Sequence, residues 1–261
     1  MTQFQSQISL HGSRLVRYLS DLAVSDVQPS HKDFALRLGQ MFDFSDSIKL
    51  SRVHGGLKRL KFEPLDITAD AIKREFLQVR QAAVKAILKS FEPDAAGVKY
   101  RFPVAKEPQA GNESQGSPGF EVYQRFYLGH QRELESRVQF LQSFVRDGAM
   151  GLSPRLAKLV ELELALGETV AQQGRRFFGV IPKLLERRFH FLWLEYQQQQ
   201  HQQPLFEGED ARRPITWLEQ FRREMQGLLL AELEARLQPV LGLVEAIDED
   251  AVQDIKRSKH D

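Results

Sequence analysis

Residues 214–247 decide the fold of this chain, and they read PITWLEQFRREMQGLLLAELEARLQPVLGLVEAI. Thr216 can accept a hydrogen bond from a free backbone N–H at a helix start, and Glu219 can reach back to complete a capping box. Apolar residues then recur every three or four positions, at Leu218, Phe221, Met225, Leu229, Leu233, Leu237, Val240 and Val244. This spacing predicts one long amphipathic helix with a single buried face.

A helix over this stretch would be about 45 Å long, at about 1.5 Å per residue. The pairs Glu219–Arg223 and Glu232–Arg236 have the spacing of ion pairs one helical turn apart, and we expect both on the solvent side. Pro239 lacks a backbone N–H and predicts a kink near the end. So long an apolar face must be covered by other helices, which predicts an all-α fold containing a bundle of long antiparallel helices.

Three further long helices are predicted upstream. Thr68 can cap the first, which should end near Ser90. The second should run over 120–147 and be followed by a turn at 148–152. The third begins at Ser153-Pro154, a cap followed by a proline, and should reach about residue 195.

Two features modify the third helix. Pro182 predicts a sharp kink or a break between Phe178 and Lys183, because an interior proline costs about 3 kcal/mol. The glutamine-rich residues 197–203 predict a polar exit from the helix.

The N-terminal part predicts a unit of three short helices. The first should carry Leu15 and Leu19 on its inner face, the second should begin at Pro29-Ser30 and extend to Phe42, and the third should end at Gly55-Gly56. Residues 91–119 are rich in proline and glycine and predict a flexible linker, in which a short strand over 98–104 is conceivable. The predicted organisation is therefore an N-terminal helical unit (1–90), a linker (91–119), a long-helix bundle (120–247) and a polar tail (248–261).

Composition narrows the class of protein. The chain has 261 residues, 42% of them hydrophobic, which is enough for a sizeable core. A net charge of +1 gives no overall field that would attract nucleic acid or a membrane. There is no cysteine, which excludes disulfides and thiolate metal sites and fits a cytosolic protein. No uncharged apolar run is long enough to cross a bilayer.

Two basic groups are the candidate contact residues. If the third long helix continues past Pro182, Arg176, Lys183 and Arg187 lie along one line, flanked by Arg175 and Arg188. Such a line has three interpretations: contact with the phosphates of nucleic acid, contact with an acidic partner, or a solvated edge of the bundle. A second group gathers around the end of the third short helix and suggests either a helix-turn-helix DNA reader or a solvated helix end. It comprises Lys49, Arg52, Lys58 and Arg59, followed by Lys61.

The sequence contains no recognisable catalytic motif. A phosphate-binding glycine loop, a nucleophile elbow and a zinc-protease motif are all missing, and the seven histidines are scattered. We therefore expect no enzyme, no cofactor, no metal and no catalytic residue.

Several stretches together resemble a known family. These are Gly12 to Leu19, Leu36 to Ile48, Ile181 to Phe189 and Trp217 to Glu245. They are similar to a proteobacterial family of helical proteins of unknown function, encoded beside genes for an ion-driven membrane motor pair of the MotA/MotB type. That arrangement resembles the type III Zorya anti-phage defence system. The resemblance implies a cytosolic accessory component of such a system and carries no catalytic residue onto this chain.

Three functions follow as hypotheses. The first is a non-enzymatic accessory or effector protein of a Zorya-like system that binds a second accessory protein, with double-stranded DNA as a further candidate partner. The second is a purely structural helical adaptor without affinity for nucleic acid. The third is a DNA-acting nuclease with a partner subunit, disfavoured because a metal-dependent nuclease needs clustered carboxylates. The long apolar faces also make a homodimer plausible.

Overall fold

The computed structural model describes residues 14–21, 44–93, 96–103, 119–202 and 216–257. The helices in these ranges are α1 (Arg14–Asp21), α3 (Phe44–Gly56), the 3-10 helix η2 (Leu57–Arg59), α4 (Ala69–Ser90), α5 (Glu121–Leu152), α6 (Pro154–Gln202) and α7 (Trp217–Arg257). No strand occurs in this described part of the chain. The predicted all-α fold is confirmed. The second short helix predicted at Pro29 to Phe42 lies outside the described residues.

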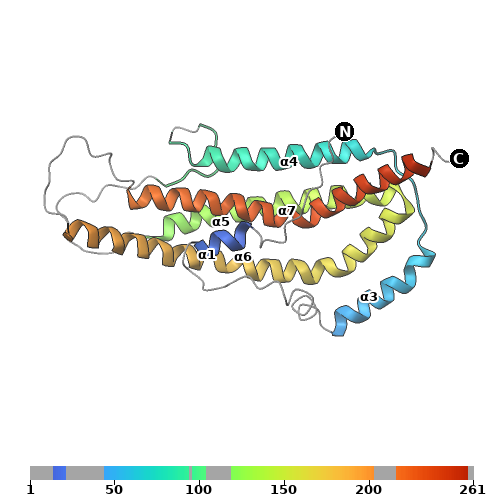
Figure 1. Cartoon of the computed structure of the whole chain (residues 1–261), viewed down its shortest axis with the longest axis horizontal. Helices are drawn as coiled ribbons and strands as arrows, with labels where there is room; N and C mark the ends of the chain where they lie inside the picture. The colour runs from blue at the N-terminus through green and yellow to red at the C-terminus, as the bar shows by residue number, and fades with distance from the viewer. Residues whose placement is uncertain (1–13, 22–43, 94–95, 104–118, 203–215, 258–261) are drawn as a thin grey trace.

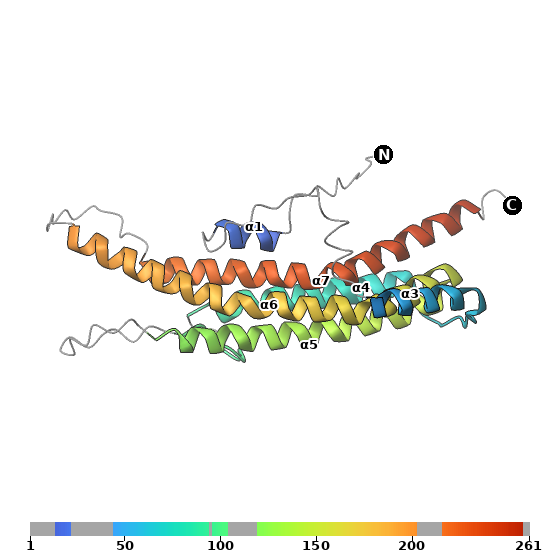
Figure 2. The same ribbon diagram turned by 90° about the horizontal axis from the view of Figure 1, so that it is seen from below.

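The four long helices form an elongated bundle in which successive helices run in opposite directions (Figure 1). α5 packs against α4, α6 and α7, and α7 also packs against α4 and α6. The two short helices lie on different members of the bundle, because α1 packs on α7 whereas α3 packs on α6. Figure 2 shows α1 on the side of α7 that faces away from α5.

The core is densest where the start of α5, the later part of α6 and the start of α7 meet. The ring of Phe189 from α6 lies 5.0 Å from that of Phe221 on α7 and 5.3 Å from that of Tyr123 on α5, measured between centroids. Trp217 packs edge-on against Phe189 at 5.1 Å. Such tilted aromatic pairs add specific geometry to the burial of large apolar surfaces.

Local sequence signals place the helix starts correctly. The hydroxyl of Thr68 accepts a hydrogen bond from the backbone N–H of Ala71 at 3.2 Å. Ser153 caps α6 in the same way, and Thr216 caps α7 by accepting from the N–H of Glu219 at 3.3 Å. Each cap satisfies one of the backbone donors that a helix start leaves without an intrahelical partner.

The turn predicted at 148–152 is wrong, because α5 remains helical to Leu152. The glycines of this stretch serve close packing instead. A Cβ at Gly148 would lie 2.5 Å from Cδ1 of Ile72, and one at Gly151 would lie 2.4 Å from Cβ of Leu65. Glycine is therefore required here by contact with neighbouring segments, and its helix-breaking tendency is overridden by packing.

Of the sharp kink or break predicted between Phe178 and Lys183, the break is wrong, because α6 is continuous from Pro154 to Gln202 with Pro182 inside it. Proline has no N–H to donate to the carbonyl four residues earlier, which is that of Phe178. The side-chain amide of Gln131 on α5 donates to this carbonyl at 3.0 Å. A neighbouring helix thus satisfies the acceptor that Pro182 leaves free. The predicted exit at 197–203 is likewise helical as far as Gln202.

α7 extends ten residues beyond the predicted end at Ile247, to Arg257. Ion pairs join Asp248 to Lys73 of α4, and Asp250 to Arg155 of α6. These contacts attach the acidic stretch, which we expected to be part of a polar tail, to two other helices.

Part of the predicted linker is packed on the bundle. Phe91 and Phe102 are buried and stack with their ring centroids 5.2 Å apart, and both contact Phe126 of α5. The backbone N–H of Phe102 donates to the carbonyl of Ser90 at 2.8 Å. Residues 98–103 form no strand, and residues 104–118 lie outside the described part.

Candidate functional site

The predicted basic line on α6 exists as a surface feature. Arg176, Lys183 and Arg187 are exposed, and none of them forms an ion pair or hydrogen bond with a described residue. Steps of seven and four residues place them on one side of the helix. Their charges are therefore available to a partner.

The two flanking arginines behave differently. Arg188 forms two hydrogen bonds with the carboxylate of Glu224 on α7, at 2.6 and 2.9 Å, and only 13% of its side chain is exposed. These hydrogen bonds raise the pKa of Arg188 above its ordinary value. Arg188 thus joins α6 to α7 and is not free for a partner. Arg175 has no partner among the described residues and lines a cavity described below.

Large apolar side chains are exposed on the same side of α6. Phe177 is 44% exposed, Val180 49%, Phe191 53% and Leu194 55%. Helical spacing interleaves them with Arg176, Lys183 and Arg187, which have no partner among the described residues, and the acidic residues Glu186 and Glu195 lie at the edges. We call this set the α6 surface: Arg176, Phe177, Val180, Lys183, Arg187, Phe191 and Leu194.

The second basic group is only partly free. Lys49 on α3 pairs with Glu168 of α6 at 3.4 Å and with Asp46 at 3.8 Å. Asp46 also accepts a hydrogen bond from Thr169 at 2.7 Å, so that this end of α3 is attached to α6. Arg52, Lys58 and Arg59 are exposed without an ion pair to the described residues. The structure does not bring this group together with the α6 surface into one described site.

A buried polar network connects α5, α6 and α7. Glu232 is fully buried and accepts hydrogen bonds from Tyr127 at 2.7 Å, from Gln131 at 3.0 Å and from Arg236 at 2.8 Å. The guanidinium of Arg236 stacks over the ring of Phe178 at 4.0 Å. Burial, together with the neighbouring Glu232 carboxylate, raises the pKa of Tyr127 well above its ordinary value.

The expectation that Glu232 and Arg236 lie on the solvent side is therefore wrong, although their spacing does form a pair. A signal was available in the sequence. Glu232 lies eleven residues after Phe221 and seven after Met225, which places it on the apolar face of the helix. A carboxylate on that face needs buried donors, and Tyr127 and Gln131 supply them.

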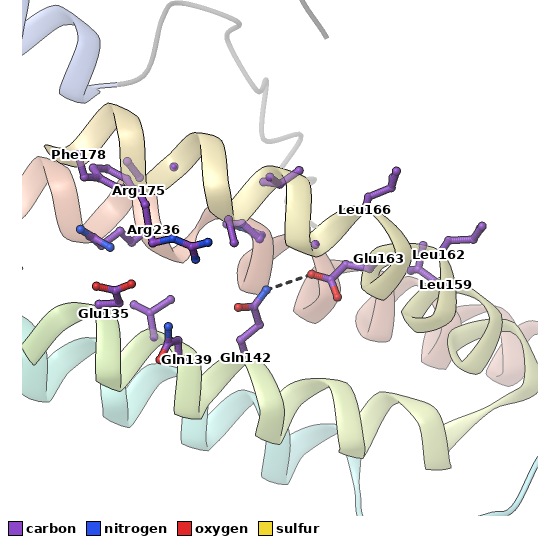
Figure 3. Close-up of a pocket in the computed structure, with 17 residues that line it drawn as sticks. Glu135, Gln139, Gln142, Leu159, Leu162, Glu163, Leu166, Arg175, Phe178 and Arg236 are labelled. Atoms are coloured by element: carbon purple, nitrogen blue, oxygen red, sulfur yellow. Dashed lines mark hydrogen bonds between the residues drawn. The ribbon is translucent and has the colours of Figure 1, made fainter. Parts of the chain in front are cut away.

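A cavity of about 530 Å³ lies beside this network, between α5, α6 and α7 (Figure 3). Its walls are mostly apolar and include Val138, Leu159, Leu162, Leu166, Val170, Phe178 and Pro239. Arg175, Arg236 and Glu135 lie together at one end, as Figure 3 shows. Glu163 bridges from α6 to Gln142 and Arg146 of α5 further along, between this end and Leu162 and Leu159.

A smaller cavity of about 260 Å³ lies at the other side of α5 and is lined by His130, Tyr100, Glu133 and Arg137 among others. His130 is buried against the ring of Phe126, and its Nε2 has no hydrogen-bond partner among the described residues. Burial lowers the pKa of His130 to about 4, against a smaller opposing effect of the Glu133 carboxylate. The histidine is therefore neutral at physiological pH.

In the ranges that the structure describes, no group of three or more histidine, aspartate or glutamate side chains is arranged to hold a metal ion. None of the helices in those ranges combines the length and apolarity that a membrane crossing needs.

Comparison with known proteins gives one match. A family model described as "Protein of unknown function (DUF3348)" matches residues 1–249. The chain belongs to the DUF3348 family. No curated protein and no solved structure matches it. The DUF3348 description names no activity and contains nothing about Zorya systems or membrane motors, so the resemblance to a family encoded beside motor genes stays a prediction.

Proposed function

We propose that this DUF3348 protein is a non-enzymatic helical adaptor that binds a protein partner through the α6 surface. The observation that carries the proposal is the interleaving of exposed Phe177, Val180, Phe191 and Leu194 with three cations that have no partner in the described part of the chain. Exposed apolar patches with a polar rim are typical of protein interaction sites, and aromatic residues and arginine are enriched among the residues that dominate binding energy.

The pattern of the α6 surface indicates the chemistry of the partner. An amphipathic helix with apolar residues on one face and acidic residues at its flanks would cover the phenylalanines and neutralise the cations. The heptad-like steps from Phe177 through Leu184 to Phe191 suit packing along the axis of such a helix.

The resemblance of the sequence supplies the biological setting of the proposal. The protein would act in the cytosol as an accessory component of a Zorya-like anti-phage system, with a second accessory protein as direct partner and the MotA/MotB-like motor as functional link. Support comes from the exposed α6 surface and from the sequence stretches that carry the resemblance, which are Gly12 to Leu19, Leu36 to Ile48, Ile181 to Phe189 and Trp217 to Glu245.

Co-expression with the proteins encoded beside it tests the proposal. The double variant Phe177→Ser/Phe191→Ser should lose co-purification of the second accessory protein and lose protection against phage in a plaque assay. The matched control is Leu77→Ser, which removes an exposed leucine of α4 that is 58% exposed. Unchanged complex formation by the double variant, with the fold intact by circular dichroism, would refute the role of the α6 surface.

DNA is the second candidate partner, and it rests on Arg176, Lys183 and Arg187 alone. Three phosphate contacts would give a salt dependence of about −2.7 in log affinity against log salt, at about −0.9 per phosphate. Arg176→Glu/Arg187→Glu should abolish such binding, whereas the exposed Arg132→Glu on α5 should not. Absence of salt-dependent binding by the unmodified protein would leave the adaptor without nucleic-acid affinity.

Two remaining hypotheses have direct measurements. Nicking of plasmid DNA in the presence of magnesium would support the nuclease hypothesis. The described residues contain no carboxylate cluster that favours it. Light scattering of the purified chain would show whether the α6 surface pairs with a second copy, in which case the Phe177→Ser/Phe191→Ser variant should be monomeric.

A further inference from the structure

We propose that the cavity between α5, α6 and α7 is a binding site for a single-chain amphiphile with an anionic head group. This site is distinct from the α6 surface and independent of the adaptor role. A volume of about 530 Å³ lies within the range of about 300 to 1,000 Å³ of small-molecule sites. Its walls combine many apolar side chains with a few polar groups, of which two arginines lie at one end (Figure 3), and such a composition is usual for small-molecule sites.

The head-group end is built from side chains held by the buried network. The Nε–H of Arg236 donates a hydrogen bond to Glu232, Nη2 forms an ion pair with the same carboxylate, and the ring of Phe178 supports the face of the guanidinium. Nη1 of Arg236 has no hydrogen bond to a described residue. Arg175 enters the same end from α6 without a partner among the described residues, so that two guanidinium groups converge there (Figure 3).

An anion of the ligand would bind between these two groups. Arginine suits carboxylate and phosphate because its planar N–H donors form paired, charge-assisted hydrogen bonds. Glu135 also lines this end. Because its carboxylate repels another anion, the head group should contact Arg175 on the side that faces away from Glu135. The hydrocarbon chain would extend along Leu166, Leu162 and Leu159, and burying it provides a favourable free energy for each methylene group.

Two variants separate the head-group site from the chain site. Arg175→Gln removes a charge from an exposed side chain without a described partner, so the fold should be unaffected. Gly174→Leu places a side chain in the cavity, since a Cβ at Gly174 meets only Phe178, at an ordinary contact distance of 3.7 Å. Leucine is also a better helix former than glycine, so this variant should fold.

The chain offers a matched control for each variant. Arg132→Gln removes an exposed arginine of α5 that has no partner among the described residues and does not line the cavity. Gly179→Leu adds the same side chain at a glycine of α6 where a Cβ would meet nothing within 4 Å. Both controls should bind ligand like the unmodified protein, and circular dichroism of all four variants checks that each is folded.

The experiment titrates the purified full chain with dodecanoate, dodecyl phosphate and the uncharged dodecanol below their aggregation limits, by isothermal titration calorimetry. We expect saturable binding of one dodecanoate or dodecyl phosphate per chain. Arg175→Gln should weaken it about tenfold or more, as expected for losing a hydrogen bond to a charged group. Gly174→Leu should abolish it. Flotation with vesicles of anionic phospholipid distinguishes a membrane source of the ligand from a free fatty acid or alkyl phosphate.

Three results would overturn the proposal. The first is the absence of binding by the unmodified chain. The second is equal affinity for dodecanol, which would remove the role of the arginines. The third is unchanged binding by Gly174→Leu, which would place the ligand elsewhere. Because the variants leave the α6 surface intact, loss of ligand binding together with retained partner binding would separate this site from the adaptor function.

Discussion

The face of α7 that packs on α5 and the outer face of α6 are both built from heptad-like apolar repeats, yet they meet different surroundings. On α7, Phe221, Met225 and Leu228 are completely buried, and even Glu232 on that face finds three donors. On α6, Phe177 and Phe191 remain about half exposed between cations that have no partner in the described part of the chain. An apolar repeat therefore indicates that a helix can pack against a second helix. The charged residues beside the repeat indicate whether that second helix comes from the same chain or from a partner.

The largest expected effect tests the buried side of this comparison. Glu232→Ala leaves the guanidinium of Arg236 largely buried without its counter-charge and removes the acceptor of Tyr127 and Gln131. Breaking a buried pair in this way should cost about 3 to 5 kcal/mol of unfolding free energy. Chemical denaturation measures it. The control Glu234→Ala, which removes a largely exposed ion pair with Arg14, should cost less than about 1 kcal/mol. Equal effects of the two variants would contradict a structural role for the network.

The features that sequence predicted well are local. Thr68, Ser153 and Thr216 mark helix starts because the capping bond joins residues only three apart. The basic line of α6 was also predictable, since its spacing depends only on the helix itself. What sequence could not show was set by other helices: Gln131 of α5 supports the carbonyl beside Pro182, and Glu224 of α7 removes Arg188 from the free charges. The cavity arises from three helices together and has no signature in any one of them.

The acid sensitivity of the fold is the next prediction. Because burial lowers the pKa of His130 to about 4, the unfolded chain binds a proton at this histidine below its ordinary pKa of 6.5 while the folded chain does not. The contribution of His130 to the unfolding free energy should therefore be constant above pH 6.5. Between pH 6.5 and 4 this contribution should fall by roughly 2 to 3 kcal/mol. Near His130, Glu133 forms ion pairs with Lys99 and Arg137. His130→Phe removes the titrating imidazole and leaves these ion pairs in place.

Unfolding free energies of the His130→Phe variant at a series of pH values measure this effect. The slope between pH 6.5 and 4 should be smaller than in the unmodified protein, and the two curves should run parallel above pH 7. An unchanged slope would mean that His130 becomes protonated without unfolding, through water entering the small cavity.

A pair of glycine substitutions compares close packing with open surface. At Gly148, a methyl group would lie 2.5 Å from the fully buried Ile72, which cannot move away easily. Gly148→Ala should therefore destabilise by about 1 to 3 kcal/mol. At Gly179, where nothing lies within 4 Å, Gly179→Ala should stabilise by about 0.5 to 1 kcal/mol through helix propensity. Thermal unfolding of both variants should show shifts of opposite sign, and a gain at Gly148 would mean that α4 and α5 can separate.

The smallest expected effect concerns the exposed side of the comparison. Phe177 and Phe191 are about half exposed, and their rings contact Phe178 and Arg188 respectively, so Phe177→Ser/Phe191→Ser should lower the unfolding free energy by about 1 kcal/mol per site. Denaturation in the absence of partner measures this directly. A much larger loss would show that the two rings serve the fold of the isolated chain, and the α6 surface would then be a poor candidate for an interface. A loss of this small size together with the loss of partner binding would show that these residues act in recognition, which is the distinction that the contrast between α6 and α7 predicts.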